Sequence, residues 1–375
     1  MRQVRWASGT VAMAMALALC GVRPAAGDVI SDQAAAIVIY PDVLVDRVDS
    51  EVLDTVIQLS NTSLDPVIVW CFYENANSHC TNSGEVCEDP SECCDSVTGC
   101  GVCLPGWNET DFHIRLTPRQ PIGWLASEGL VDFPLDGVKR QGRGGSSNAG
   151  SRIPPVPEDP FNGALKCLVV DDTNRPLDQN VLKGEATITT RDTEYAVFDV
   201  SKHNAVGIKA QSGAVNDDNE LVLGGDEAEY NGCPNVIILN HFFDFAINPV
   251  SDAEVFTRLI LVPCTEDLLR QIPGGAVIQY LVYNEFEQRF STSRPFDCKQ
   301  DLYISDIDTT QPERSIFSAG VGGTLTGQTR LTAIGSGVVG LAEEVHEAQN
   351  PGTFFASFNV HMQGDREDAD VITLP

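Results

Sequence analysis

The chain has 375 residues, of which 42% are hydrophobic and 21% charged, and its formal net charge at pH 7 is −29. This composition excludes a disordered or membrane-embedded protein, and the length allows two or three domains with a substantial core. The acidity argues against binding to nucleic acid or to an anionic membrane. The acidity is compatible with Ca²⁺ binding, with a cationic partner or simply with solubility.

Residues 1–27 have the pattern of a signal peptide. Two arginines lie near the start, an apolar stretch ends at Cys20, and Ala25-Ala26-Gly27 offers a small-residue cleavage site. The stretch is too short to cross about 30 Å of hydrocarbon, so we expect no transmembrane segment in the mature chain. A lipoprotein would attach its lipid to Cys20, but the bulky Leu19 stands where a small residue is usual.

The stretch 54–73 predicts a hairpin of two strands joined by a polar turn. Thr55, Ile57 and Leu59 share one face of the first strand, which is the period of two of a half-buried strand. The second strand, Val67–Phe72, is apolar on both faces. We therefore expect other parts of the chain to cover it from both sides.

A cysteine-rich insert, 80–103, interrupts the first predicted β-sandwich unit, 28–136. Six cysteines in so short a segment cannot form a core by burial alone, so we expect disulfides, in any of fifteen connectivities. A zinc site is the rival interpretation and a thiol exchanger another, both resting on the Cys-x-x-Cys pair that ends the insert. The spacing resembles that of knottin-like cystine modules. The cysteines are Cys80, Cys87, Cys93, Cys94, Cys100 and Cys103.

Three further segments follow in the predicted organisation. Residues 137–160, rich in Gly, Ser and Pro, predict a flexible linker. Residues 161–300 predict a second β-sandwich unit, with one short helix over Glu266–Gln271. Residues 301–375 predict strands that complete the sandwich, because they are few for an independent domain.

Five cysteines of the predicted mature chain lie outside the insert, which leaves an odd number, since Cys20 belongs to the predicted signal peptide. One of them is therefore free, paired with the insert or bonded to another chain. The high cysteine content fits an oxidising compartment. The five are Cys71, Cys167, Cys233, Cys264 and Cys298.

The acidic loop around residue 220 is the main candidate for a calcium site, and Asp171, Asp172 and Asn174 offer a second set of oxygen ligands. Asp217, Asp218, Glu220 and Asp226 supply hard oxygen ligands of the kind that Ca²⁺ prefers, although no EF-hand pattern is present. A solvated loop is the alternative. We therefore predict no cofactor apart from a possible Ca²⁺.

No catalytic residue is predicted. Gly335-Ser-Gly-Val-Val-Gly340 matches a dinucleotide fingerprint, but the chain lacks the β-α-β context that this motif needs, so we interpret it as a glycine-rich bend. The six histidines form no protease or hydrolase signature. A platform for sugar binding could be formed by Trp70, Trp107 and Trp124. Of the three, Trp70 is the one that we expect in the core instead.

Four passages resemble a group of uncharacterised secreted bacterial proteins, and the hairpin resembles bacterial immunoglobulin-like repeats. The resemblance implies export and a β-rich fold, and no activity. We thus expect an all-β protein of antiparallel, immunoglobulin-like β-sandwich units. The passages are Ile57–Tyr73, Gly184–Ile188, Ala276–Thr292 and Ala369–Pro375.

The function expected from these patterns is that of a non-catalytic secreted or cell-envelope protein, extracellular or periplasmic, acting in adhesion, scaffolding or matrix. Its partners would be other surface proteins or glycans, and nucleic acid is not among them. The alternatives are an extracellular glycan- or peptide-binding module, with or without a dependence on Ca²⁺, and a secreted hydrolase whose site has no signature.

Overall fold

The structure is a computed structural model, and it is all-β. Its regular elements, within the described residues, are strands and two short 3-10 helices, Pro90–Cys93 and Ile304–Ile307. No described helix has the length and apolar content needed to cross a bilayer. The predicted signal peptide and residues 137–151 of the predicted linker lie outside the described residues. The described residues are 33–47, 52–87, 90–95, 97, 99–130, 152–191, 197–212, 218–248, 250, 252–307, 325–347, 353–365 and 368–375.

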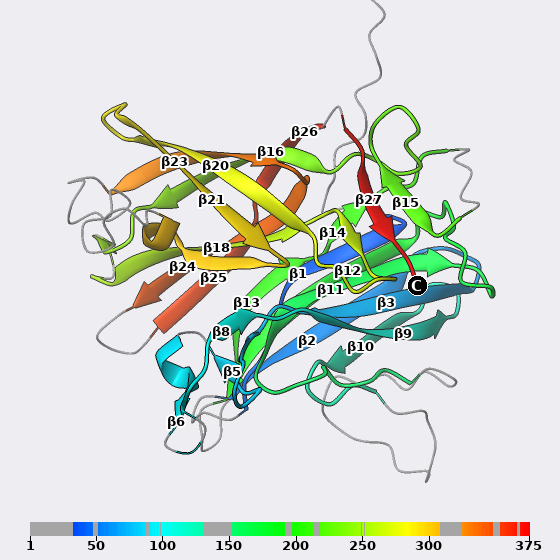
Figure 1. The fold of residues 1–375 in the computed structure, drawn as a ribbon. Coiled ribbons are helices and arrows are strands. Elements are labelled where there is room, and N and C mark those ends of the chain that lie inside the picture. The colour runs from blue at the N-terminus through cyan, green and yellow to red at the C-terminus, as the bar shows by residue number, and fades with distance from the viewer. Residues whose placement is uncertain are drawn as a thin grey trace, which may run out of the picture.

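Two sheets packed face to face form a first sandwich, at the lower right of Figure 1. Alternate residues of both sheets turn inward to a shared apolar core, as the period of two requires. One sheet has the order β14 (Val206–Ile208), β1 (Ile37–Val45), β11 (Phe161–Val170), β3 (Val67–Asn75) and β9 (Asn108–Leu116). The other has the order β10 (Pro121–Leu125), β2 (Val52–Asn61), β12 (Leu182–Arg191) and β13 (Val197–Asn204).

The strand β3 is covered on both faces, which confirms the expectation from its sequence. Val69 lies in the core of the first sandwich, whereas Trp70 and Phe72 lie in a second core on the opposite face of the sheet. The predicted hairpin is wrong, however, because β2 pairs with β10 and β12 in the other sheet. A strand that is apolar on both faces needs a doubly covered sheet, and β2 carries polar residues on one face.

A second sandwich lies at the upper left of Figure 1 and has its own core. One sheet has the order β21 (Arg289–Asp297), β20 (Gly275–Asn284), β23 (Thr326–Ile334), β16 (Pro234–Phe242) and β26 (His361–Asp365). The other has the order β17 (Ala246–Ile247), β18 (Glu254–Pro263), β24 (Val338–Glu347) and β25 (Thr353–Asn359), with β22 (Gln300–Tyr303) also paired to β18.

The sheets divide the chain differently from the predicted bounds. Residues 161–208, placed at the start of the predicted second unit, provide β11 to β14 of the first sandwich. Residues 301–375 provide β22 to β27, of which β22 to β26 belong to the second sandwich and β27 to a smaller sheet. Pairing between strands that are distant in the sequence decides which sandwich a segment belongs to. The composition along the chain does not reveal this pairing.

A three-stranded sheet joins the two sandwiches around the second core of β3. It consists of β15 (Glu220–Leu223), β27 (Asp370–Thr373) and β19 (Glu266–Asp267), and the β19–β27 pair is parallel. The short helix expected over Glu266–Gln271 is wrong: the segment is β19 followed by a turn. Glu266 is buried there and pairs with Ile372, so tertiary contacts override the local preference.

The segment 80–103 forms a disulfide-rich lobe that projects from the first sandwich (Figure 1, cyan). Its short strands are β4 (Ser78–Cys80), β5 (Val86–Cys87), β6 (Cys94–Asp95), β7 (Gly99–Cys100) and β8 (Cys103–Pro105). Three of the five disulfides lie here: Cys80–Cys93, Cys87–Cys103 and Cys94–Cys100. The other two are Cys71–Cys167 and Cys233–Cys264, and Cys298 is a buried thiol.

Candidate functional site

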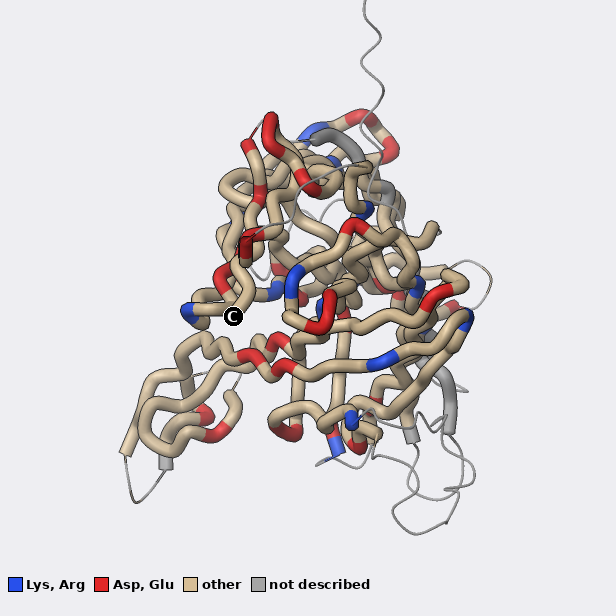
Figure 2. Tube along the Cα trace, turned by 90° about the vertical axis from the view of Figure 1, so that its right-hand side faces the viewer, with Lys and Arg blue, Asp and Glu red and all other residues tan. Residues whose placement is uncertain are grey.

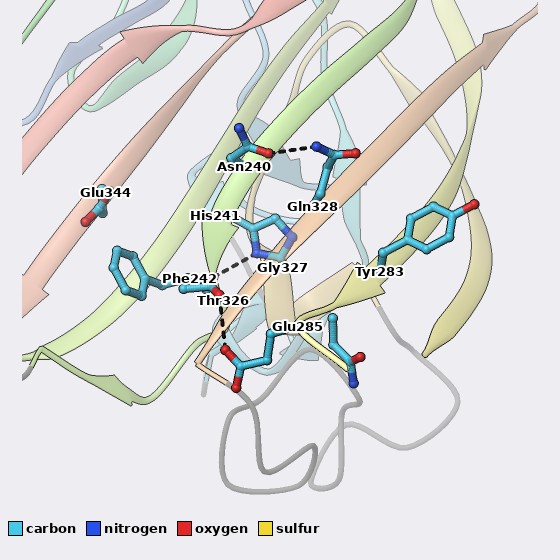
Figure 3. A pocket seen from close by; sticks show the side chains of 10 residues that line it. Asn240, His241, Phe242, Tyr283, Glu285, Thr326, Gly327, Gln328 and Glu344 are labelled. Atoms are coloured by element: carbon cyan, nitrogen blue, oxygen red, sulfur yellow. Dashed lines mark hydrogen bonds between the residues drawn. The ribbon is translucent and has the colours of Figure 1, made fainter. Parts of the chain in front are cut away.

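An open groove with many polar residues in its lining is found at one end of the second sandwich, near the ends of β16, β20 and β23 (Figure 3). Its volume is about 500 Å³. Cross-strand pairing aligns its residues: Gln328 is opposite both Asn240 and Tyr283, and Gly327 is opposite His241. The lining residues are Asn240, His241, Phe242, Tyr283, Asn284, Glu285, Thr326, Gly327, Gln328 and Glu344.

His241 forms the buried wall of the groove and is held as a neutral ring. Its Nδ1 donates to the Phe242 carbonyl over 2.9 Å, because that oxygen can only accept, so Nε2 accepts from the Thr329 hydroxyl over 2.8 Å. Burial lowers the pKa of His241 to about 4. A Cβ at position 327 would lie 2.6 Å from the Phe243 ring and 3.0 Å from the His241 ring, so glycine there makes room for both rings. With both nitrogens occupied, His241 shapes the groove.

The exposed rim carries amides, a phenol and a carboxylate. Gln328 Nε2 donates to Asn240 Oδ1 over 3.0 Å, which orients both amides and leaves Asn240 Nδ2 and Gln328 Oε1 for a ligand. Glu285 accepts from the Thr326 hydroxyl over 3.2 Å, as Figure 3 shows. Tyr283 is 37% exposed beside them. Such a rim presents donors and acceptors together with one aromatic face.

At the inner side of the groove, Glu344 forms a short hydrogen bond with a histidine of the same strand. Its Oε1 lies 2.6 Å from His346 Nε2, and Asn248 Nδ2 lies 3.4 Å from His346 Nδ1. The amide nitrogen can only donate, so Nδ1 accepts and Nε2 carries the proton toward Glu344. Glu344 is thereby fixed on the side of the groove formed by β24.

Buried charges gather where the two sandwiches meet, in two groups. The first, here called the Arg258 cluster, comprises Asp42, Arg258, Lys299, Asp301 and Glu343. Arg258 grips Asp301 through two hydrogen bonds and lies 3.0 Å from Glu343, while Lys299 lies 2.7 Å from Asp42. Burial opposes the charge of Asp42, but the two cations outweigh it and lower the pKa of that carboxyl to about 2.

The second group, here called the Lys166 cluster, comprises Glu74, Lys166 and Glu266 in the core between the sandwiches. Lys166 Nζ lies 3.0 Å from Glu74 Oε2 and 2.7 Å from Glu266 Oε2. Burial and the neighbouring Glu266 raise the pKa of Glu74 well above its ordinary range, against the opposing effect of Lys166. One cation therefore serves two carboxyl groups.

The calcium candidates are not brought together by the described structure. Asp218, Glu220 and Asp226 are exposed, Asp218 accepts a hydrogen bond from the Glu220 amide, and Asp217 lies outside the described residues. Within the part of the chain that is described, the one set of three ligand atoms close enough for a metal belongs to Cys80, Cys87 and Cys93. Those sulfurs are in disulfides. Calcium binding stays a prediction.

Two other sequence motifs now have structural roles. Residues 335–337 of the glycine-rich segment form the bend between β23 and β24, and residues 338–340 begin β24. Ser336 Oγ in the bend accepts from the Cys264 and Thr265 amides. Cys100 and Cys103 are bonded to different partners, so they do not form an exchanger pair with each other.

The tryptophans do not form a sugar platform. Trp70 and Trp124 are 3% and 1% exposed, and their Nε1 atoms donate to Asp111 and to the Tyr73 hydroxyl. Trp107 packs partly buried against the core between the sandwiches. All three rings serve packing, which is the usual role of large buried aromatic side chains.

Sequence reasoning missed the groove because its residues come from four strands, β16, β20, β23 and β24, that are far apart in the chain. The available signal was weak: Asn240 and Gln328 are exposed polar residues on strands, which is ordinary for the wet face of a sheet. The same holds for Glu74 and Lys166, which look like ordinary surface charges until the sheets are assembled. No protein-family model matches the chain, and a search of curated proteins found no relative.

Proposed function

We propose that the chain is a non-catalytic secreted or cell-envelope protein that acts by binding, and that the groove of the second sandwich takes a neutral, hydroxyl-rich ligand such as a glycan. The observation that carries this proposal is the rim itself. Side-chain amides oriented by each other, a phenol and a carboxylate are the groups that hydrogen-bond sugar hydroxyls, and Tyr283 adds a face for stacking.

The setting of the groove supports binding to a large partner. The groove is open, so a chain can lie across it, and its lining comes from strands of both sheets of the second sandwich. Acidic residues are spread over the tube in Figure 2, which disfavours anionic polymers as ligands. The five disulfides suit an oxidising, non-cytoplasmic compartment, where surface glycans are found.

A glycan array probed with the purified chain tests this proposal. The best-bound oligosaccharide is then titrated into the wild type, into the Asn240→Ala/Gln328→Ala double variant, and into Gln279→Ala as the matched control. Gln279 is an exposed amide on β20, outside the groove. Two lost hydrogen bonds predict at least about tenfold weaker binding by the double variant and an unchanged control. An array without any bound glycan, or equal losses in both variants, would contradict the proposal.

Two further measurements separate the alternatives. Repeating the titration with calcium and then with a chelator tests the Ca²⁺-dependent version, because equal affinities would remove calcium from the account. A screen of glycosidase, esterase and peptidase substrates tests the non-catalytic part. Turnover that is abolished by the Asn240→Ala/Gln328→Ala double variant would replace binding with hydrolysis.

A further inference from the structure

We propose that Lys166 and Glu74 become joined by an amide bond between their side chains, with Glu266 carrying the protons. The cross-link would connect β11 and β3 within one sheet of the first sandwich. This modification is independent of the groove, and it rests on the geometry and charge of the Lys166 cluster.

The three side chains are already in contact and shielded from water. Lys166 Nζ lies 3.0 Å from Glu74 Oε2 and 2.7 Å from Glu266 Oε2, and the side chains are at most 3% exposed. β3 and β11 are paired along most of their length, with Ala164 opposite Glu74, so the backbone holds the amine against the carboxyl group. Such fixed proximity replaces an encounter in solution and supplies a large part of the rate enhancement of intramolecular reactions.

The carboxyl group of Glu74 is in the right form to be attacked. A carboxylate resists a nucleophile, whereas a protonated acid can lose its hydroxyl as water. Burial and Glu266 raise the pKa of Glu74 well above its ordinary range, so this acid keeps its proton. The Glu74 and Glu266 side chains are hydrogen-bonded to each other, so the proton on Glu74 lies between them. Glu74 Oε1 and Glu266 Oε1 receive no hydrogen bond from any other described residue. The cluster therefore has fewer donors than its buried oxygen atoms can use, which is costly in a protein interior.

The amine needs a base within the cluster, and Glu266 provides it. Burial lowers the pKa of Lys166, but the two glutamates outweigh it and raise the pKa, so the resting side chain is an ammonium that has to lose a proton within the cluster before it can attack. Glu266, at 2.7 Å, can take that proton directly. The free amine then attacks Glu74 Cδ, a C–N bond forms, the C–OH bond breaks, and Glu266 hands its proton to the departing hydroxyl. The remaining N–H proton returns to Glu266, and one water molecule leaves.

The reaction replaces two buried charges by neutral groups. An ammonium and a carboxylate are expensive to keep in a core, and the product contains an amide and a neutral acid instead. The Arg258 cluster lacks these conditions. Lys299 lies 2.7 Å from Asp42, but the two cations there hold the pKa of Asp42 at about 2, so its carboxyl group is ionised and resists attack. Only one of the two buried lysine–carboxyl contacts is therefore expected to react.

The decisive measurement is the mass of the purified, reduced and alkylated chain. We expect a deficit of about 18 Da, the mass of one water, relative to the sequence of the mature chain. A tryptic map should contain a branched peptide that joins Lys166 to Glu74. A full mass, or a deficit located at other residues, overturns the proposal. This result needs no variant, so it does not depend on a substituted chain folding.

Three variants identify the participants. Lys166→Met should have the full mass. Cys298→Ser should keep the deficit, which excludes a thioester between that buried thiol and Glu74, a product that would also have lost water. Glu266→Gln removes the base, so its deficit should grow more slowly with time after purification. A deficit that persists in Lys166→Met, or an unchanged rate in Glu266→Gln, contradicts the assigned roles.

Discussion

The Arg258 cluster and the Lys166 cluster lie in the same interface and differ in how many cations serve each carboxyl group. In the first, Arg258 and Lys299 serve three acids, and a guanidinium contacts all three of them. In the second, one lysine serves two. Asp42 of the first cluster and Glu74 of the second are both at most 2% exposed, so the difference between these two carboxyl groups comes from the charges around them and not from their exposure.

As a consequence, Asp42 in the Arg258 cluster stays ionised, whereas Glu74 in the Lys166 cluster keeps its proton. The pKa of Asp42 falls to about 2, because its cations outweigh burial, whereas the pKa of Glu74 rises well above its ordinary range. Arginine's planar fork with its five donors suits the first arrangement, and a single ammonium cannot match it. A buried carboxyl group thus stays ionised where cationic donors are plentiful. Where they are scarce, it holds a proton and can react.

The largest effect is expected from Arg258→Met. This change leaves three buried carboxyl groups with Lys299 alone, and breaking a buried ionic network of this kind costs about 3–5 kcal/mol. Urea unfolding followed by tryptophan fluorescence measures the loss. The matched control is Arg47→Met, which removes an exposed pair with Asp159 and should cost less than about 1 kcal/mol. Similar losses in the two variants would show that the buried cluster does not stabilise the interface.

A smaller and pH-dependent effect is expected from Asp42→Asn. The folded-state pKa of Asp42 is lowered from 3.8 to about 2, so its contribution is present above the unfolded value and is lost as the pH falls through 2. The variant should be about 2 kcal/mol less stable than the wild type at pH 5–7, and the gap should close on acidification. Unfolding curves between pH 2 and pH 7 measure this gap. A gap that widens as the pH falls would mean that Asp42 is not held ionised.

Much of the fold could be predicted from local patterns. The sequence of a strand shows directly which of its faces are buried. Ile57 and Leu59 alternate with more polar residues because one face of β2 is buried, and β3 is apolar on both faces because both are buried. The cysteine density of 80–103 likewise predicted a disulfide-rich lobe. These features depend on neighbours in the chain.

The pairing of distant strands and the functional residues could not be predicted in this way. β11 lies beside β1 and β3, although a predicted linker separates it from both in the sequence. Lys166 meets Glu266 only because β19 is packed against the same sheet, 100 residues later. A polar residue inside an apolar strand, such as Lys166, is the one local sign of such a site, and it does not identify the partner.

The smallest effect is expected from Glu74→Gln, which sharpens the contrast with Asp42→Asn. Glu74 is held as a neutral acid, so an amide of the same shape should change the free energy of unfolding by less than about 1 kcal/mol between pH 5 and pH 7. The new amide nitrogen can also donate to the Glu266 carboxylate, in place of the Glu74 hydroxyl. If Lys166 forms the cross-link, the substituted amide can yield the same bond by releasing ammonia, so the expectation holds in either case. Urea titrations of both variants, run side by side, provide the comparison. A loss as large as that of Asp42→Asn would mean that Glu74 is ionised in the core, and then neither the contrast between the clusters nor the proposed attack on its carboxyl group would stand.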